Sequence, residues 1–252
     1  MPLLLKLLLV PSLIAAVTLA GRRWGPKVAG WLSAFPIVSG PILLAIALEQ
    51  GSDFAATAAA NTLLAVLAIL VFSVAYARMA KRQGVFASMT AALLAWALSV
   101  ALLRSLEFPL WAGFAAVLAA LLAAPRLIGK IDARKTSAAP ARDLPWRMAA
   151  GAFLTLAVTA AAAQMGPRLS GMFAMFPVMS TVLVGFSHRS SGPGFAVDLL
   201  RGMVRGYYAF AVFCLVLALL LRAQPLAPAF LAATVCALAV QLGLRAAMAR
   251  LK

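Results

Sequence analysis

Residues 25–55 read GPKVAGWLSAFPIVSGPILLAIALEQGSDFA, and the stretch recurs 141 positions later, where residues 166–196 read GPRLSGMFAMFPVMSTVLVGFSHRSSGPGFA. The two copies align without a gap. Nine positions are identical: Gly25/Gly166, Pro26/Pro167, Gly30/Gly171, Phe35/Phe176, Pro36/Pro177, Ser39/Ser180, Gly51/Gly192, Phe54/Phe195 and Ala55/Ala196. Chance identities in a chain this rich in Ala and Leu would be Ala and Leu, whereas most of these are Gly, Pro, Phe and Ser. The pattern therefore indicates an internal duplication.

The composition is that of an integral membrane protein. Of the 252 residues, 65% are hydrophobic and 11% are charged, and the mean hydropathy is +1.02. A soluble domain of this length cannot bury so much apolar surface. The formal net charge of +16 would suggest nucleic acid in a soluble protein. Here the basic residues lie between apolar runs, and they predict a charged membrane face instead.

The apolar runs predict an all-α polytopic protein with about nine transmembrane helices, because a hydrocarbon core of about 30 Å needs about 20 apolar residues per helix. The expected spans are 3–20, 29–48, 54–77, 86–103, 108–124, 148–164, 170–187, 199–221 and 226–244. The first could pass for a signal peptide, but its stronger basic cluster, Arg22 and Arg23, follows the apolar run and no A-x-A site closes that run. We expect a retained span.

The repeat and the span count together predict a single membrane domain, 1–252, with a 4+1+4 inverted-topology repeat. Repeat 1 covers 3–103 and repeat 2 covers 144–244. Between them lie an unpaired linking helix, 108–124, and a basic cytoplasmic loop, 125–146. Because one unpaired span separates the two copies, the second must enter the membrane in the opposite orientation.

The basic residues predict the orientation. With the N-terminus outside and the C-terminus inside, 18 of the 22 Lys and Arg residues fall on the inner side. The four on the outer side are Lys6, Arg104, Arg168 and Arg222. This bias follows the positive-inside rule. Each outer residue is the repeat mate of an inner one, and a cation at the end of a helix whose head group extends to the interface is the ordinary interpretation.

The second span of each copy carries a proline in its middle, at Phe35-Pro36 and Phe176-Pro177. Proline removes a helical hydrogen bond and clashes with the preceding turn, so the freed carbonyls must face protein or a wet cavity. Inverted repeats place transport sites at such interruptions, near the midplane. The candidate substrate-binding residues are Phe35, Pro36, Ser39, Gly40, Asn61, Phe176, Pro177, Ser180 and Thr181. The alternative is a pair of packing kinks, with Gly30 and Gly171 allowing close helix approach.

Catalytic and metal-binding patterns are missing from the sequence. It contains no HExxH, GxSxG, Walker loop or paired carboxylates, and we expect neither an enzyme nor a cofactor or metal site. His188, the one histidine, is expected at an interface beside Arg189. Cys214 and Cys236 lie in apolar runs and are expected to be structural thiols. Asn61 has two interpretations, a site residue or a hydrogen-bonding contact between helices.

The repeated pattern Gly-Pro-basic-x-x-Gly followed by Phe-Pro-x-x-Ser resembles that of small, uncharacterised bacterial inner-membrane proteins classed as domains of unknown function. The resemblance covers most of the chain, although only the two motif stretches are specific. It implies a bacterial cytoplasmic membrane and supplies no activity.

These features predict a secondary transporter or permease for a small solute, with its site between the broken helices of the two copies. Helix N-termini at the breaks would favour an anionic solute. The expected partners are the solute and the lipid bilayer, without nucleic acid, and homo-oligomerisation is left open. The alternative function is a non-transporting membrane module, such as a lipid-binding or complex-assembly subunit. A polar crevice that reaches the Phe-Pro positions would favour transport, and a dry interior would favour the module.

Overall fold

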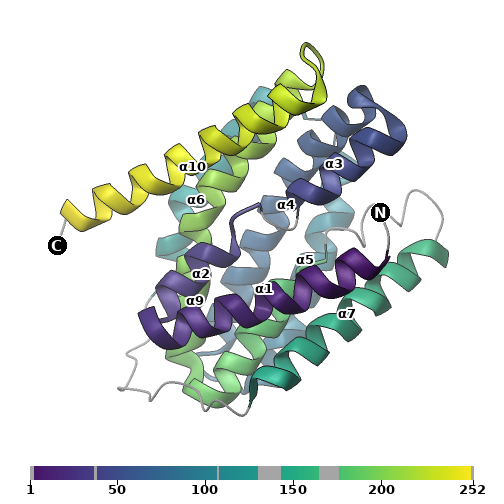
Figure 1. The fold of residues 1–252 in the computed structure, drawn as a ribbon. Coiled ribbons are helices and arrows are strands. Elements are labelled where there is room, and N and C mark those ends of the chain that lie inside the picture. The colour runs from purple at the N-terminus through teal and green to yellow at the C-terminus, as the bar shows by residue number, and fades with distance from the viewer. Residues whose placement is uncertain (1–2, 37–38, 107, 130–142, 165–175, 251–252) are drawn as a thin grey trace.

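The computed structural model describes residues 3–36, 39–106, 108–129, 143–164 and 176–250, and its regular elements there are all helices (Figure 1). They are α1 (Leu3–Trp24), α2 (Pro26–Ser33), α3 (Ser39–Gln50), α4 (Ser52–Met79), α5 (Val85–Leu103), α6 (Leu110–Ile128), α7 (Leu144–Gln164), α9 (Val178–Leu220) and α10 (Leu226–Arg250). In this part of the chain five helices, α4, α5, α6, α9 and α10, are long and apolar enough to cross a membrane. The prediction of an α-helical membrane protein is confirmed at that level.

Single glycines separate helices at several places where the sequence predicted a polar loop between two spans. Gly25, Gly51 and Gly192 share one left-handed backbone conformation, with φ of 89°, 89° and 85° and ψ of 168°, 167° and 171°. Only glycine adopts this region without strain. Each of these residues therefore redirects the chain while the helices on either side continue up to it.

The bend at Gly192 corrects one predicted boundary. Spans 170–187 and 199–221 were expected to be separated by a polar joint, but within α9 only Gly192 has non-helical backbone angles. Pro193 follows it, and proline suits the first position of a helix because its missing N–H would have no partner there. The helix therefore restarts at once. Gly51, the repeat mate of Gly192, separates α3 from α4 in the same way.

The expected loop 125–146 is also shorter than predicted. Helix α6 continues through Pro125 and Arg126 to Ile128, and α7 begins at Leu144. Gly129 ends α6 with a φ of 69° and a ψ of −166°, backbone angles that only glycine adopts without strain. Most of the remaining link, 130–142, lies outside the described residues.

Both Phe-Pro pairs precede a helix start with the same hydrogen bond. Helix α2 ends at Ser33 and α3 begins at Ser39, so the first copy is broken and not merely kinked. The Pro36 carbonyl accepts the Gly40 N–H at 2.9 Å, and the Pro177 carbonyl accepts the Thr181 N–H at 2.8 Å. These are matching positions in the two copies. The residues before Phe176 lie outside the described chain, as does Gly171.

Helix α2 crosses α9 at backbone contact distance. A Cβ on Gly30 would collide with the Leu199 carbonyl and lie 2.7 Å from the Met203 nitrogen. A Cβ on Gly202 would collide with the Lys27 carbonyl. At this crossing the expected role of Gly30 in close helix approach is confirmed.

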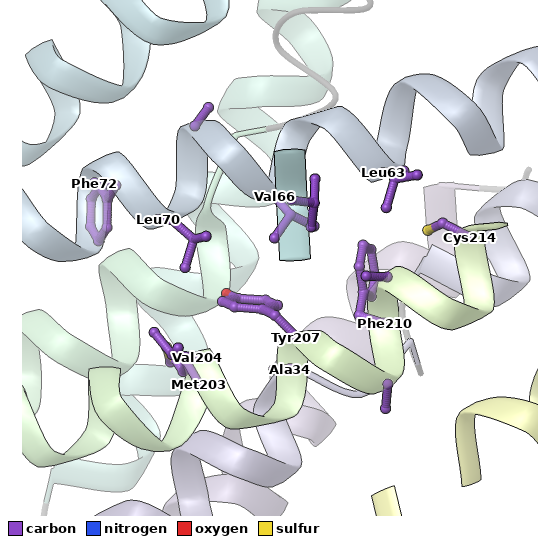
Figure 2. Packing of buried hydrophobic residues seen from close by; sticks show 14 of the residues in the cluster. Ala34, Leu63, Val66, Leu70, Phe72, Met203, Val204, Tyr207, Phe210 and Cys214 are labelled. Atoms are coloured by element: carbon purple, nitrogen blue, oxygen red, sulfur yellow. The ribbon is translucent and has the colours of Figure 1, made fainter. Parts of the chain in front are cut away.

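The core lies between α4 and α9, whose apolar side chains face one another (Figure 2). On α4, Leu63, Val66 and Leu70 point toward α9, and Tyr207 and Phe210 on α9 point back between them. Around this pair, α5 packs on α4, α10 packs on α9, α1 packs on α7, and α6 contacts both α4 and α9.

The crossing of α2 and α9 predicts the effect of one added methyl group. Gly30→Ala should lower the thermal midpoint in detergent by roughly 4–8 °C, because the backbones must separate to admit the Cβ. Gly243→Ala on α10 is the matched control, since no atom lies within 4 Å of its added Cβ. It should leave the midpoint unchanged or raise it, because alanine favours helix over glycine. Equal midpoints for both variants would contradict a tight crossing.

Candidate functional site

A cavity of about 1000 Å³ lies among α1, α2, α3, α4, α7 and α9. Its wall is mostly apolar, with ten polar side chains. The lining residues are Leu9, Val10, Ser33, Ala34, Phe35, Ser39, Ile42, Leu43, Ile46, Gln50, Asp53, Phe54, Thr57, Ala58, Asn61, Thr62, Ala65, Ile69, Thr155, Val158, Phe176, Pro177, Val178, Met179, Ser180, Tyr207 and Phe210. Both Phe-Pro breaks contribute to this wall. The volume is at the upper end of the usual range for small-molecule sites.

The structure brings six of the nine predicted site residues to this cavity: Phe35, Ser39, Asn61, Phe176, Pro177 and Ser180. The other three, Pro36, Gly40 and Thr181, are absent from its lining. They take part in the first hydrogen bonds of α3 and α9. Their role in the fold is therefore to fix where these two helices begin.

Two helices begin at the cavity. Ser39 is the first residue of α3, Val178 is the first of α9, and both line the wall. The first N–H groups of a helix have no partner within it and carry the positive end of its dipole. The cavity therefore receives positive potential from the backbone of both copies.

Helix α4 contributes a polar stripe. Asp53, Thr57 and Asn61 are four residues apart and lie on one face of the helix. All three are exposed. Apolar residues of α3, including Ile42 and Ile46, line the same cavity. Sequence reasoning found only Asn61, although the spacing of four could have revealed the other two.

At the end of the cavity near the start of α9, which we call the deep end, two hydroxyl groups lie close to aromatic rings. Ser180 is buried, its hydroxyl donates to the Met203 sulfur at 3.6 Å, and Tyr207 lines the same wall. The Phe176 ring meets the Trp96 ring edge to face, with centroids 5.2 Å apart. These contacts hold the second Phe-Pro break in place. Nothing in the sequence pattern marked Tyr207.

An ionic cluster lies farther along α9 than Ser180, where α1, α7 and α9 meet. Arg147 on α7 is only 2% exposed, and its Nε and Nη2 donate to Asp143 Oδ2 at 2.9 and 2.7 Å. Arg22 on α1 donates to the other oxygen of Asp143 at 2.6 Å. Arg147 also donates to Ser187 and Ser190 on α9, each at 3.2 Å. The cluster therefore joins α1, α7 and α9.

His188, next to Ser187 of this cluster, is buried within the protein, and its position at the membrane interface stays a prediction. It is 8% exposed, and its Nδ1 is 2.8 Å from the Tyr76 hydroxyl on α4. Ser187 is seven residues beyond Ser180 on α9, and Tyr76 is seven beyond Ile69 on α4. At 1.5 Å per residue each separation is about 10 Å. The cavity and the cluster are thus distinct along the same helices.

Comparisons of the chain with protein-family models, curated proteins and solved structures found no match. The described residues contain no group of three or more His, Cys, Asp or Glu side chains that could hold a metal ion. The site is therefore interpreted from its own geometry.

Because two arginines share the Asp143 carboxylate, we expect its neutralisation to lower the stability of the protein strongly. Asp143→Asn removes the charge that faces Arg22 and Arg147, and breaking such a buried pair should cost about 3 kcal/mol. We expect the thermal midpoint to fall by roughly 6–12 °C. Asp198→Asn is the matched control because its ion pair with Lys27 is longer, at 3.6 Å, and more exposed. An equal fall in both variants would contradict the expectation that the buried Asp143 ion pairs cost more to break than the exposed Asp198 pair.

Proposed function

We propose that this protein is a secondary transporter or permease for a small solute and that the cavity at the two Phe-Pro breaks is its binding site. The observation that carries the proposal is the lining itself: the helix break at Phe35-Pro36 and the helix start after Phe176-Pro177 open onto one large cavity. Substrate sites of inverted-repeat transporters lie where discontinuous helices meet. We place the protein in the bacterial cytoplasmic membrane.

The proposed architecture has nine spans in a 4+1+4 inverted repeat, with the N-terminus outside and the C-terminus inside. Matched backbone details support the repeat. Gly51 and Gly192 have the same left-handed conformation, and Pro36 and Pro177 accept the same hydrogen bond. The pairing of α1 with α7, and of α6 with both α4 and α9, is the pattern expected around a two-fold axis.

The two ends of the cavity differ in a way that suits alternating access. Gln50 and Asp53, at the turn between α3 and α4, are exposed lining residues and mark its mouth. At the opposite end, the Asp143 cluster and the Tyr76–His188 hydrogen bond join four helices. We propose that this end is the closed inner gate of an outward-facing state. Opening it would require these buried polar contacts to separate.

The electrostatics favour a solute with an anionic or carboxylate group at the deep end. The N-termini of α3 and α9 both supply positive potential there. Asp53 has the opposite sign but lies eight residues before Asn61 on α4. That separation is about 12 Å, so its charge acts mainly at the mouth.

A non-transporting module, such as a lipid-binding or complex-assembly subunit, is the alternative. It would be favoured by a dry interior at the Phe-Pro positions. The hydroxyl and carboxamide groups of Ser39, Asn61 and Ser180 line that region, and they favour a wet cavity and transport.

Removing the matched serines predicts a loss of transport without a loss of protein. Untargeted uptake and export profiling of an overexpressing strain against a deletion strain would first identify the solute. Ser39→Ala and Ser180→Ala should then reduce its transport while membrane abundance stays normal. Ser73→Ala is the control, because Ser73 is buried and bonds its own helix at Ile69. Normal transport in both variants, or parallel loss of abundance and activity, would remove these serines from the site.

A cysteine in the polar stripe predicts accessibility from one side of the membrane. In a Cys214→Ala, Cys236→Ala background, Asn61→Cys should react with membrane-impermeant 2-sulfonatoethyl methanethiosulfonate in spheroplasts. The reaction should be much slower in inverted vesicles. Ser73→Cys, on the same helix and fully buried, should stay unreactive in both.

The outcomes of this labelling distinguish a wrong membrane orientation from the absence of an accessible cavity. Faster reaction in inverted vesicles would reverse the proposed orientation and keep the cavity. No reaction at Asn61→Cys from either side would show that no accessible cavity exists, and the transport proposal would fail.

A further inference from the structure

A second, smaller pocket lies beside the ionic cluster, among α1, α2, α7 and α9. Its volume is about 20 Å³, which is enough for one water molecule or one monatomic ion. It is lined by Val17, Thr18, Gly21, Arg22, Ala29, Arg147, Leu183, Ser187, Phe195 and Leu199. None of these residues lines the large cavity.

Buried hydrogen-bond donors line this pocket. Thr18 is 6% exposed, and its hydroxyl has no hydrogen-bond partner within the described structure. Ser187 is 3% exposed and accepts from Arg147 Nη1, which leaves its own hydroxyl hydrogen to donate. A buried hydroxyl without a partner is costly, so Thr18 indicates that an acceptor belongs here.

Arg147 adds charge and a further donor. A guanidinium has five N–H groups. The contacts with Asp143, Ser187 and Ser190 use four of them. The fifth is on Nη1, the nitrogen that contacts Ser187 at the pocket wall. Arg22 lines the same pocket, whereas the Asp143 carboxylate does not.

We propose that this pocket binds a single halide-sized anion, chloride under cellular conditions. The ligand must accept hydrogen bonds from Thr18, Ser187 and Arg147, and it must fit about 20 Å³. A water molecule meets the size but gains little from two guanidinium groups, whereas an anion is attracted by both. The small volume favours a monatomic ion over a tetrahedral oxyanion. The proposal does not depend on the transport function.

Thermal unfolding of the purified protein in detergent tests the proposal directly. Sodium chloride should raise the thermal midpoint by roughly 2–4 °C over sodium gluconate at equal ionic strength, because the ion binds only the folded state. Thr18→Val removes the hydroxyl at constant shape and should abolish this rise. Thr18→Ser restores the hydroxyl and should recover it.

The control is Thr234→Val on α10, whose hydroxyl bonds the Phe230 carbonyl at 2.8 Å; it should keep the chloride effect. An equal rise in wild type and Thr18→Val would place the ion elsewhere and overturn the proposal. No difference between chloride and gluconate would leave water as the occupant and would also overturn it.

Bromide gives a readout that does not depend on stability. Crystals of the unmodified protein grown in sodium bromide should show an anomalous peak between Thr18, Arg147 and Ser187. Bound bromide there would support the site even if Thr18→Val failed to fold. An empty or water-filled pocket in such crystals would refute it.

Discussion

The close approach of α2 to α9 is the contact on which the rest of the structure depends. At Gly30 and Gly202 each helix presents backbone to the other, and a single Cβ on either would collide. Because α2 ends three residues after Gly30, the crossing also determines where Phe35 and Pro36 leave the helix. Helix α9 begins directly after the second Phe-Pro pair. One backbone contact therefore positions the break at Phe35-Pro36 and the start of α9 around the same cavity.

Left-handed glycines make this arrangement compact. A conventional loop between α3 and α4 would occupy several residues and need its own hydrogen bonds. Gly51 performs the reversal alone, and Gly192 does the same within α9. The backbone on both sides stays helical up to the bend, so few of its polar groups lose their helical partners. The short helices next to these bends can then pack in the protein interior.

Polar side chains gather in the cavity, where they are exposed, and in the ionic cluster, where they are buried and paired. In the cavity, the side chains of Thr57 and Asn61 are exposed and available to a ligand. In the ionic cluster, Arg147 is almost fully buried and nearly all its donors are used. A buried ion pair contributes little net stability, but breaking it leaves an uncompensated charge. The cluster therefore specifies how α1, α7 and α9 meet more than it strengthens the fold.

The amino-acid sequence alone was sufficient to predict an α-helical membrane protein and a duplicated motif, and it left a break or a kink as alternatives at Phe35-Pro36. Each of these follows from local chemistry: apolar length, proline geometry and the recurrence of Gly, Pro and Phe. The sequence also indicated Ser39, Asn61 and Ser180 as candidate site residues, because polar side chains are rare in such apolar runs.

Tertiary structure decided which of these residues meet. Tyr207 reaches the cavity only because α9 lies against α4, and the same packing brings His188 to Tyr76, 112 residues away in the chain. Likewise, the single-residue bends at Gly51 and Gly192 were not apparent among polar neighbours that resemble a loop. Burial and pairing depend on side chains brought together from distant positions, and hydrophobicity along the chain carries no information about those partners.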